Sequence, residues 1–508
     1  DSLSMTQKYR DRVVYAPGTV IISAAAEVSD VRKIVEPVLQ PDPDSRLIYI
    51  DLARDSFKLG GSSFAQFKNR LGTEAPTVQD PEYFVKAFNL LQALIEDHSL
   101  LAGHDVSAGG LLTTLMEMCF ANTTGGMEVD ISGIPAEVVP VLFSEKPGVV
   151  IQVSKHREIS ALLEKAGILH HVIGRPIEGR ELVLRSREDN LSLDIGHYRD
   201  LWFRTSYLLD RKQSGGALAT ERYEHYKKHA LEFRLENFKG SFESLDIDPK
   251  RRTDSGVTAA IIREKGVNGD REMAHALYLA GFDVKDVHMT DLIAGRETLT
   301  DIQMIVFVGG FSNSDVLGSA KGWAGAFKYN EKARVALEKF YARKDTLSLG
   351  VCNGCQLMVE LDLVVPEHDQ KPRMEHNASG KFESAFLGLK VEKNPSVMLG
   401  SLEGMNLGIW VAHGEGRFAL PRPENEYHIA AKYSHSTYPA NPNGSDYDVA
   451  ALCSSDGRHL AIMPHLERAY QPWQCAYYPE DRKKDEATPW LEAFVNARRW
   501  VAAKKNKD

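Results

Sequence analysis

The stretch Thr346-Leu347-Ser348-Leu349-Gly350-Val351-Cys352-Asn353-Gly354-Cys355-Gln356 indicates the fold of the carboxyl-terminal half of this chain. An apolar, strand-like run ends in Gly-x-Cys-x-Gly and passes into a helix-like run at residues 356–361. This order is typical of a nucleophile elbow, in which a sharp turn between a strand and a helix lifts one side chain clear of the sheet. Gly350 and Gly354 would leave room for the tight backbone, and the positive end of the following helix would favour the thiolate. The pattern predicts an enzyme that attacks a carbonyl with Cys352.

Other interpretations of the same residues remain open. Cys352 and Cys355 form a Cys-x-x-Cys pair, which also fits a redox pair, half of a zinc site or a buried structural cysteine. A zinc site needs a second pair of ligands, and the remaining cysteines, Cys119, Cys453 and Cys475, form no second Cys-x-x-Cys. A thioredoxin-like pair usually lies near the start of its β-α-β unit, whereas roughly 90 residues of alternating pattern precede this one.

Composition limits the class of protein. A length of 508 residues predicts about three domains. A hydrophobic content of 43% with 26% charged residues is ordinary for a globular protein, and a net charge of −9 argues against a broadly basic surface for nucleic acid. No run approaches the roughly 18 apolar residues that a membrane span requires. Five cysteines, an odd and sparse set, favour a reducing cytoplasm over a disulfide scaffold. We therefore expect a cytoplasmic protein that binds neither nucleic acid nor membrane.

The amino-terminal region, residues 1–204, mixes two kinds of pattern. Strand-like apolar runs occur at residues 19–23, 46–50 and 148–153. A helical period runs from Tyr83 to Ile95, and the residues predicted to share its buried face are Phe84, Phe88, Leu91 and Ile95. This mixture predicts an α+β domain. Residues 205–255 are polar and charged, with a helix candidate at residues 220–235, and we interpret them as a linker.

From residue 256 to residue 508 the pattern becomes an alternation of strands and helices. Strands are predicted at residues 257–262, 284–289 and 304–308, with a helix between the first two that turns Met273, Leu277 and Ala280 inward. Alternating β and α elements predict a parallel, doubly wound sheet. In such sheets chemistry gathers at the carboxyl ends of the strands, which is where Cys352 would lie.

A cysteine nucleophile needs a base and a group that orients the base. The last apolar strand, at residues 460–463, runs into Pro464-His465-Leu466-Glu467. In an extended segment positions i and i+2 face the same side, so His465 and Glu467 can converge. The carboxylate would hold the imidazole in the tautomer whose other nitrogen accepts the proton of Cys352. By itself His-x-Glu is a common pattern in a chain with 17 histidines.

An oxyanion site is predicted where another strand ends in paired glycines. The run Phe307-Val308-Gly309-Gly310-Phe311 could aim backbone N–H groups at a developing negative oxygen. An ordinary tight turn explains the same glycines equally well.

In combination these motifs resemble the class I (triad) glutamine amidotransferases, which carry the elbow cysteine, the Gly-Gly and the late Pro-His-x-Glu in this chain order. Longer strings resemble the carboxyl-terminal portion of the phosphoribosylformylglycinamidine synthase family, the large amidotransferases of purine biosynthesis. These strings lie at residues 309–312, 315–318, 350–356, 413–417, 438–445 and 463–465, and in the first region at residues 59–63 and 104–111. The chain departs from the family in having Leu466 where Pro is common, and Asn313-Ser314 where Tyr-Gly is common. Neither departure removes a catalytic group.

The resemblance implies a fold for each region. Residues 256–508 would form a flavodoxin-like, doubly wound amidotransferase domain. Residues 1–204 would form a second synthetase-like α+β domain, like the carboxyl-terminal half of aminoimidazole ribonucleotide synthetase and truncated at its amino end.

The resemblance also implies functions for individual residues. Cys352 would form a thioester with glutamine, with His465 as base and then acid and Glu467 orienting it. Gly310 and the backbone after Cys352 would supply the oxyanion hole, and Gln356 would help to hold glutamine.

In the first region Asp105 would be a magnesium ligand and Ser107 a nucleotide contact, so ATP and Mg²⁺ are the implied cofactors. The alternative is that the segment from Asp105 to Ser107 only caps a helix that begins near Leu111.

The implied reaction explains why two such regions share a chain. Ammonia released from glutamine would travel inside the protein to formylglycinamide ribonucleotide that ATP has activated, giving formylglycinamidine ribonucleotide, ADP and phosphate. The family's chains are much longer and this one lacks an initial Met, so we expect a fragment. Most nucleotide contacts would lie in its missing amino-terminal part, leaving at most the glutaminase half. The rival hypotheses are a non-catalytic assembly domain and a cysteine hydrolase of small amides.

Overall fold

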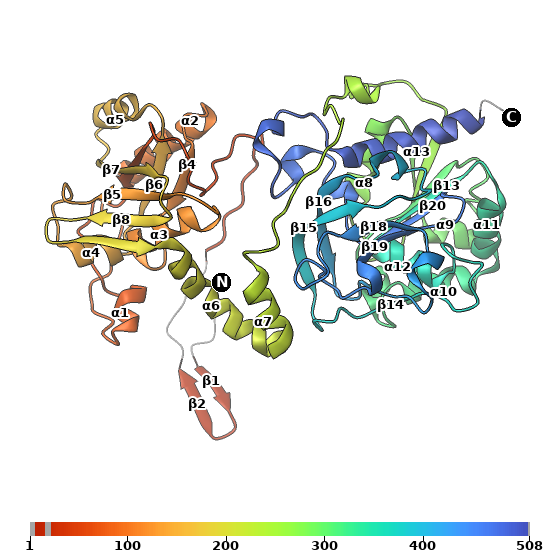
Figure 1. Cartoon of the computed structure of the whole chain (residues 1–508), viewed down its shortest axis with the longest axis horizontal. Coiled ribbons are helices and arrows are strands. Elements are labelled where there is room, and N and C mark those ends of the chain that lie inside the picture. Colours follow the sequence, from red (N-terminus) through yellow and green to blue (C-terminus); the bar gives the residue numbers. More distant parts are fainter. Residues whose placement is uncertain (1–5, 16–21, 506–508) are drawn as a thin grey trace. The chain divides into compact units, whose positions relative to one another are not determined.

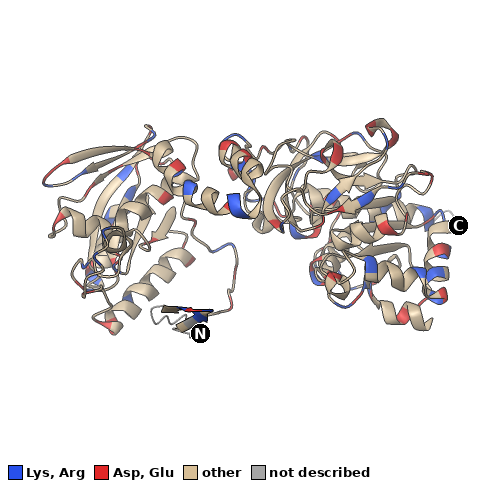
Figure 2. Ribbon diagram, turned by 90° about the horizontal axis from the view of Figure 1, so that it is seen from below, with Lys and Arg blue, Asp and Glu red and all other residues tan. Residues whose placement is uncertain are grey.

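The computed structural model describes residues 6–15 and 22–505, and its helices and strands carry the labels of Figure 1. The chain divides into two compact units, residues 1–201 and 202–508. Among the described residues, no helix has the length and apolar character needed to cross a membrane. Basic and acidic residues are interspersed along the ribbon of both units (Figure 2), so each unit presents charges of both signs.

The first unit is built on a seven-stranded sheet with strand order β4-β6-β3-β7-β5-β8-β9. All neighbouring strands in it are antiparallel except the parallel pair β5 and β8. The strands are β3 (Arg46–Asp51), β4 (Ala102–Asp105), β5 (Gly126–Asp130), β6 (Gly148–Val153), β7 (His170–Ile177), β8 (Glu181–Arg185) and β9 (Asn190–Asp194), and a separate hairpin pairs β1 (Thr6–Tyr9) with β2 (Arg12–Tyr15). The helices are α1 (Ser63–Phe67), α2 (Pro81–Glu96), α3 (Gly110–Phe120), α4 (Val138–Phe143) and α5 (His156–Lys165).

Helices cover both faces of this sheet, which confirms the predicted α+β domain. Ile48 and Ile50 of β3 pack in one core cluster with buried residues of α2 and α5. Leu47 and Tyr49 of the same strand pack in another cluster with α3 and α4, as the two-residue alternation of a strand requires. The strands predicted at residues 46–50 and 148–153 are β3 and β6. Most of the strand predicted at residues 19–23 lies outside the described residues, and residues 22 and 23 belong to no strand.

The helix predicted from Tyr83 to Ile95 is α2, but of the four residues predicted to share its buried face only Leu91 is buried. The buried residues of α2 are Tyr83, Ala87, Leu91 and Leu94, whereas Phe88 is 47% exposed and Phe84 and Ile95 are only half-buried. The Tyr83 hydroxyl explains the difference, because it donates to the Asp51 carbonyl at 2.6 Å and accepts from the Leu169 N–H at 2.9 Å. These two bonds turn Tyr83, rather than Phe84, toward the sheet.

The second unit is built on a nine-stranded sheet with strand order β11-β10-β12-β13-β20-β19-β18-β15-β16. The strands are β10 (Thr258–Arg263), β11 (Asp283–His288), β12 (Met304–Phe307), β13 (Leu347–Val351), β15 (Glu383–Val391), β16 (Asn406–His413), β18 (Ile429–Tyr433), β19 (Val449–Cys453) and β20 (His459–Ile462), while β14 (Arg373–Glu375) pairs with β17 (Arg417–Ala419) in a small sheet of its own. Five of these strands are parallel: β10, β11, β12, β13 and β20. Numbered 1 to 5 along the chain, they lie in the sheet in the order 2-1-3-4-5, which is the flavodoxin-like order. The predicted doubly wound sheet is therefore confirmed. The four antiparallel strands that extend it were not predicted.

Helices cover both faces of the parallel strands. They are α8 (Asp270–Ala280), α9 (Met289–Ala294), α10 (Lys321–Lys328), α11 (Glu331–Ala342), α12 (Asn353–Glu360) and α13 (Pro489–Lys505). Helices α8 and α13 pack on each other, whereas α10 packs on both α11 and α12 and α9 on α11, so the two groups lie on opposite faces (Figure 1). The 3-10 helices are η1 (Glu243–Leu245), η2 (Ser312–Asp315), η3 (Gly400–Leu402), η4 (Glu424–Glu426), η5 (Asp446–Asp448), η6 (Leu466–Arg468), η7 (Pro472–Gln474) and η8 (Glu480–Arg482).

Residues 205–255, which we interpreted as a linker, contain the end of α6 (Ile195–Gln213), all of α7 (Gly216–His225) and η1. The helix predicted at residues 220–235 instead ends at His225. The backbone of Arg234 exchanges hydrogen bonds with Asn406 of β16, which requires an extended rather than a helical chain.

Side chains of this segment pack on the second unit. Phe238, Leu245 and Ile247 join its core. Arg222 lies 3.2 Å from Asp210 and 3.1 Å from Glu383 of β15, and these carboxylates are almost fully buried. The division of the chain at residues 204 and 255 remains a prediction.

Candidate active site

Cys352 occupies the turn between β13 and α12, so the predicted strand–turn–helix order is confirmed. Its backbone has φ 53° and ψ −109°, a conformation that costs a non-glycine residue free energy and is characteristic of functional sites. The turn is fixed on both sides, because the Cys352 N–H donates to the Ile462 carbonyl at 2.9 Å and its carbonyl accepts from the Gln356 N–H at 3.0 Å. The side chain is only 5% exposed.

Glycine at position 354 allows α12 to start directly against the end of the neighbouring strand. A methyl group added to Gly354 would lie 2.0 Å from the carbonyl oxygen of Phe307, the last residue of β12. The elbow therefore depends on the absence of a side chain at this position.

His465 and Glu467 follow β20, at the same edge of the sheet. The Nδ1 atom of His465 lies 2.6 Å from Oε1 of Glu467, and the two side chains are 2% and 0% exposed. Burial by itself lowers the pKa of His465, but the Glu467 carboxylate and the Cys352 sulfur, which shares a hydrogen bond with the imidazole, together raise this pKa well above its usual value. The arrangement favours a thiolate beside an imidazolium.

Gly309 shows how closely the sulfur-bearing and imidazole-bearing side chains approach each other. A methyl group on Gly309 would lie 2.8 Å from Cε1 of His465 and 3.3 Å from Cβ of Cys352. Residues 352 and 465, from different strands, therefore meet beside one glycine at the end of β12.

Cys352 and His465 line a cavity of about 130 Å³. The other residues that line it are Asn268, Gly310, Phe311, Asp315, Ser319, Gln356, Phe382, Ala412, His413, Gly414 and Arg468. Gly310, the predicted oxyanion donor, lines this cavity with φ 110°, and its function as a donor remains a prediction.

Gln356 lines the cavity wall, but both ends of its amide are engaged within the protein. Its Nε2 donates to the Glu415 carbonyl at 2.7 Å, and its Oε1 accepts from Asn353 at 3.0 Å. Gln356 therefore fixes the loop that carries Glu415.

The sequence interpretation gave no function to Asp315, His413 and Glu415. Oδ1 of Asp315 accepts from the Asn353 amide at 3.3 Å, and Oε2 of Glu415 accepts from the Ser319 N–H at 3.1 Å. Burial raises the pKa of Asp315, and the charge of Glu415 adds to this effect. The string at residues 413–417 was the available signal for His413 and Glu415, and the resemblance assigned it no chemistry.

The two departures from the family pattern fit the structure. Asn313 and Ser314 have φ of 52° and 58°, the left-handed conformation, at the positions where Tyr-Gly is common. Leu466 is fully buried in the core. Asn313 and Ser314 thus adopt a left-handed conformation without a glycine, and Leu466 packs in the core in place of the proline.

Asp105 and Ser107 belong to the first unit. Asp105 ends β4 with its side chain 78% exposed, 3.4 Å from His104, and Ser107 is also exposed. Residues 6–15 and 22–505 contain no group of three or more His, Cys, Asp or Glu side chains that could hold a metal ion.

The capping alternative for the segment from Asp105 to Ser107 was wrong. The N-cap of α3 is Gly109, in a left-handed conformation and without a side-chain cap. Instead, the Glu145 carboxylate accepts from the N–H groups of Gly109 at 2.8 Å and Ser63 at 2.7 Å, which ties together two of the strings that carry the resemblance.

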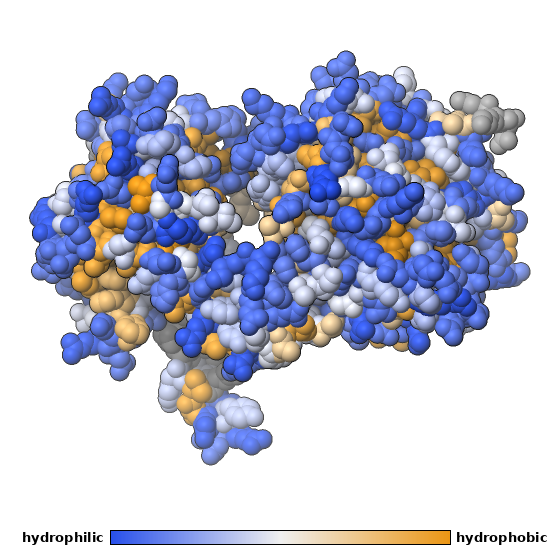
Figure 3. Space-filling model, viewed as in Figure 1, coloured by the Kyte–Doolittle hydropathy of each residue, from blue (hydrophilic) through white to orange (hydrophobic). Residues whose placement is uncertain are grey.

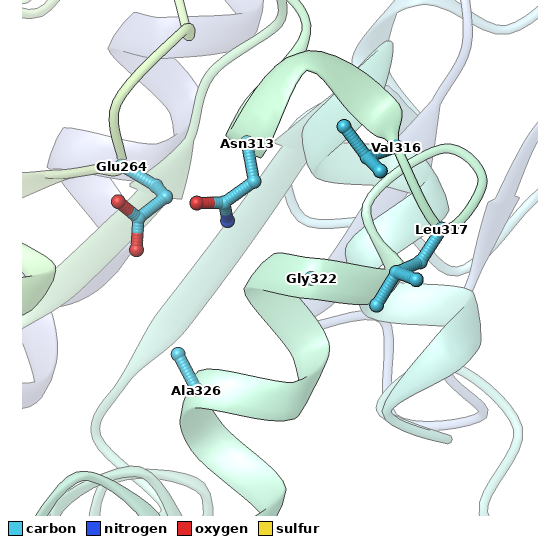
Figure 4. Close-up of a pocket in the computed structure, with 6 residues that line it drawn as sticks. All are labelled: Glu264, Asn313, Val316, Leu317, Gly322 and Ala326. Atoms are coloured by element: carbon cyan, nitrogen blue, oxygen red, sulfur yellow. The ribbon is translucent and has the colours of Figure 1, made fainter.

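A second cavity, of about 440 Å³, lies beside the loop after β12 (Figure 4). Asn313 and Glu264 face each other across it, while Val316 and Leu317 extend from the loop and are 81% and 72% exposed. Patches of hydrophobic residues also occur elsewhere on the face seen in Figure 3. Neither Cys352 nor His465 lines this cavity, so its chemistry is separate from that of the elbow.

Two protein families match the chain. Residues 256–501 match the CobB/CobQ-like glutamine amidotransferase domain, and residues 43–187 match the carboxyl-terminal domain of AIR synthase related proteins. The chain is 39% identical over 99% of its length to the probable phosphoribosylformylglycinamidine synthase, chloroplastic/mitochondrial, of Arabidopsis thaliana, and 39% identical over 99% to the phosphoribosylformylglycinamidine synthase of Homo sapiens. It covers 37% and 40% of those relatives, respectively. A solved structure of PurLQS from Thermotoga maritima is 27% identical, with a TM-score of 0.39, and covers 48% of this chain and 99% of that one.

Proposed function

Since the chain belongs to the phosphoribosylformylglycinamidine synthase family, we propose that it hydrolyses glutamine at Cys352 and supplies ammonia for purine biosynthesis. One observation carries this proposal. The imidazole of His465, held by Glu467 at 2.6 Å, lines the same cavity as Cys352, which carries the sulfur of the elbow. This is the arrangement that an acyl-transferring cysteine requires.

The geometry supports a two-step reaction. The thiolate of Cys352, whose proton His465 holds, attacks the side-chain carbonyl carbon of glutamine, which converts the carbonyl oxygen to an oxyanion. The N–H groups of Gly310 and of Asn353, the residue after the nucleophile, would stabilise that oxyanion. When the carbon–nitrogen bond breaks, His465 returns the proton and ammonia leaves. Water then attacks the thioester with His465 again as base, which releases glutamate and regenerates the thiol.

Glu467 acts through His465. Its hydrogen bond to Nδ1 leaves the opposite ring nitrogen for proton transfer and stabilises the imidazolium when it forms. Gln356, whose amide is engaged by Glu415 and Asn353, contributes by shaping the pocket that holds glutamine.

We further propose that ammonia reaches formylglycinamide ribonucleotide activated by ATP, giving formylglycinamidine ribonucleotide, ADP and phosphate. The chain spans about two fifths of the length of the curated relatives it matches, so this second half-reaction also needs residues that correspond to the rest of those proteins. In this chain Ser107 is the candidate nucleotide contact. The exposed Asp105 would hold Mg²⁺, which usually takes one or two carboxylates together with nucleotide phosphates and neutralises phosphate charge.

The cytoplasm is the compartment we propose, because all five cysteines are free. The plant relative is named as chloroplastic/mitochondrial, so location can differ between members. We propose no nucleic-acid or membrane partner.

Release of glutamate from glutamine by the 508-residue protein tests the proposed function. Cys352→Ala should abolish this release, while Cys453→Ala, a buried cysteine of β19 away from the cavity, should retain it. A glutamine-like alkylating agent should label Cys352. Undiminished hydrolysis by Cys352→Ala would favour an assembly domain, and failure of the glutamine analogue to label Cys352 would favour a hydrolase of other small amides.

A further inference from the structure

His413 is a second buried imidazole at the elbow cavity. It is the last residue of β16, is 2% exposed and lines the same cavity as Cys352. Its neighbour Ala412 places a carbonyl oxygen 3.6 Å from the Cys352 sulfur, so this end of β16 borders the reaction centre. We propose, on the basis of the proposed glutaminase function, that the Nδ1–H group of His413 binds the α-carboxylate of glutamine.

The hydrogen-bond network fixes which nitrogen of His413 carries the proton. Oδ1 of Asn443 accepts from the Ser445 N–H at 3.0 Å, and a backbone N–H can only donate, so the orientation of the Asn443 amide is settled. Its Nδ2 must therefore be the group that lies 3.1 Å from Nε2 of His413. Because Nδ2 can only donate, a hydrogen on Nε2 of His413 would face another donor, so Nε2 is the nitrogen without a hydrogen. The neutral ring then has its hydrogen on Nδ1.

The ring is both neutral and locked. Burial, with a smaller contribution from the charge of His465, lowers the pKa of His413 to about 3. A methyl group on Gly416 would lie 2.1 Å from Cδ2 and 2.3 Å from Nε2 of His413, so the backbone of Gly416 packs directly on that edge of the ring. The imidazole therefore presents Nδ1 on its opposite edge, away from Asn443.

Nδ1 of His413 is a buried donor without an acceptor among the residues that the structure describes. Leaving such a donor unpaired is unfavourable, which makes an external acceptor at this site energetically valuable. Nδ2 of Asn443, which has two hydrogens, lies within hydrogen-bond distance of three groups: Nε2 of His413 at 3.1 Å, the Gly416 carbonyl at 2.8 Å and the Tyr433 hydroxyl at 3.0 Å. The network thus maintains a desolvated N–H group on a residue that lines the cavity of the nucleophile.

The chemistry of glutamine identifies the acceptor. Its oxygens are the carboxamide oxygen and the two of the α-carboxylate. The carboxamide oxygen is assigned to the N–H groups near Gly310, at the end of β12, whereas His413 reaches the cavity from β16. Arg468, which also lines the cavity, adds positive charge. A donor that contacts the carboxylate contributes equally before and during the reaction, so its loss should raise KM and leave kcat nearly unchanged.

Replacing His413 with Asn or with Gln, two amides of similar size, tests the functions of Nδ1 and Nε2 separately. The amide of Asn has its NH₂ group near the position of Nδ1, so His413→Asn can keep the cavity donor while losing the acceptor for Asn443. The amide of Gln reaches the position of Nε2, so His413→Gln can keep the acceptor for Asn443 while losing the cavity donor. His459→Gln is the matched control, because His459 is a buried imidazole at the start of β20, bonded to Ser348 at 2.9 Å and outside the cavity.

We expect His413→Gln to raise KM for glutamine about 10- to 100-fold with kcat within about threefold, His413→Asn to raise KM less than His413→Gln does, and the control His459→Gln to stay near the wild-type KM. Glutamine α-amide, which lacks the carboxylate, should bind the wild-type protein more weakly than glutamine does, and His413→Gln should lose most of that preference. Calorimetric titration of glutamine into Cys352→Ala, with and without His413→Gln, measures the same difference without turnover.

A lower kcat with unchanged KM in His413→Gln would overturn the assignment, because the donor would then serve the reacting oxygen. An unchanged preference for glutamine over its α-amide in that variant would also overturn it. If His413→Gln fails to fold, the binding of glutamine and of its α-amide to the wild-type protein tests the proposal. Equal binding of the two compounds would overturn it. Wild-type protein that releases no glutamate would instead contradict the proposed function itself.

Discussion

Nδ1 of His465 and Oε1 of Glu467 lie 2.6 Å apart at the end of β20, and both side chains are shielded from solvent almost completely. Burial lowers the pKa of His465, and the neighbouring Glu467 carboxylate and Cys352 sulfur more than reverse that effect. The Glu467 carboxylate thereby fixes the orientation of the His465 ring and raises its basicity.

Glu467→Gln should therefore reduce kcat for glutamine hydrolysis by about 10²- to 10⁴-fold, because a neutral amide neither holds the tautomer nor stabilises the imidazolium. Loss of the carboxylate also lowers the pKa of His465. The alkaline limb of the pH–rate profile, on which the protonated imidazole is lost, should accordingly move to lower pH. The shift is measured by comparing the pH–rate profiles of the wild type, Glu467→Gln and the surface control Glu338→Gln. An alkaline limb that stays at the same pH in Glu467→Gln would contradict the prediction.

Gly309→Ala should slow hydrolysis by about 10²-fold, because the added methyl displaces His465 or Cys352 from its reactive position. The control is Gly216→Ala at the start of α7, where an added methyl meets nothing within 4 Å. That substitution should leave kcat unchanged and alter the free energy of unfolding by at most about 1 kcal/mol. Equal activity of the two variants would show that the close approach beside Gly309 is not required.

Arg222→Met should lower the free energy of unfolding of the second unit by about 3 kcal/mol, since it leaves Asp210 and Glu383 as buried carboxylates with fewer partners. Arg334→Met removes an exposed pair on α11 and should cost at most about 0.5 kcal/mol. Urea unfolding of both variants gives the comparison. Equal losses would mean that the cluster around Arg222 behaves as a surface ion pair.

Stability should depend on pH through Asp210. Burial raises the pKa of Asp210, but hydrogen bonds from Lys381 and Ser214 and the charge of Arg222 hold it below its usual value. The stabilisation is thus fully present above the unfolded-state pKa of about 3.9 and is lost as pH falls through the lower folded-state value. The difference in unfolding free energy between wild type and Asp210→Asn should be constant from pH 6 to 8 and shrink below about pH 4. A difference that persists at pH 2 would refute this account.

The parallel strands and the elbow could be predicted because each depends on local sequence. Strands β10, β12 and β13 are short apolar runs buried on both faces, and Cys352 is marked by its flanking glycines. The antiparallel extension could not be predicted in the same way. Only three of the nine positions of β15 are buried, so its residues carry no continuous apolar pattern.

Within the site, too, the residues placed by local sequence could be predicted, whereas those placed by contacts between distant residues could not. His465 and Glu467 were recognisable because a strand end and an i, i+2 spacing bring them together. The state of His413 depends on Asn443, 30 positions away, and on a backbone N–H of Ser445 that orients the amide. Similarly, the buried face of α2 was decided by a hydroxyl bond from Tyr83 to the backbone of Asp51, which outweighed the greater apolarity of Phe84. Contacts of this kind leave no periodic trace in a sequence.

The buried charges that join α6 and α7 to β15 limit where this protein can be truncated without loss of stability. A recombinant amidotransferase that began at Gly256 would lack Asp210 and Arg222, and would leave Lys381 and Glu383 without two of their partners. It would also uncover the hydrophobic surface on which Phe238 packs. Gene fusions that move this domain should therefore include α7 and the part of α6 that carries Asp210, so the fusion boundary should lie nearer residue 201 than residue 256.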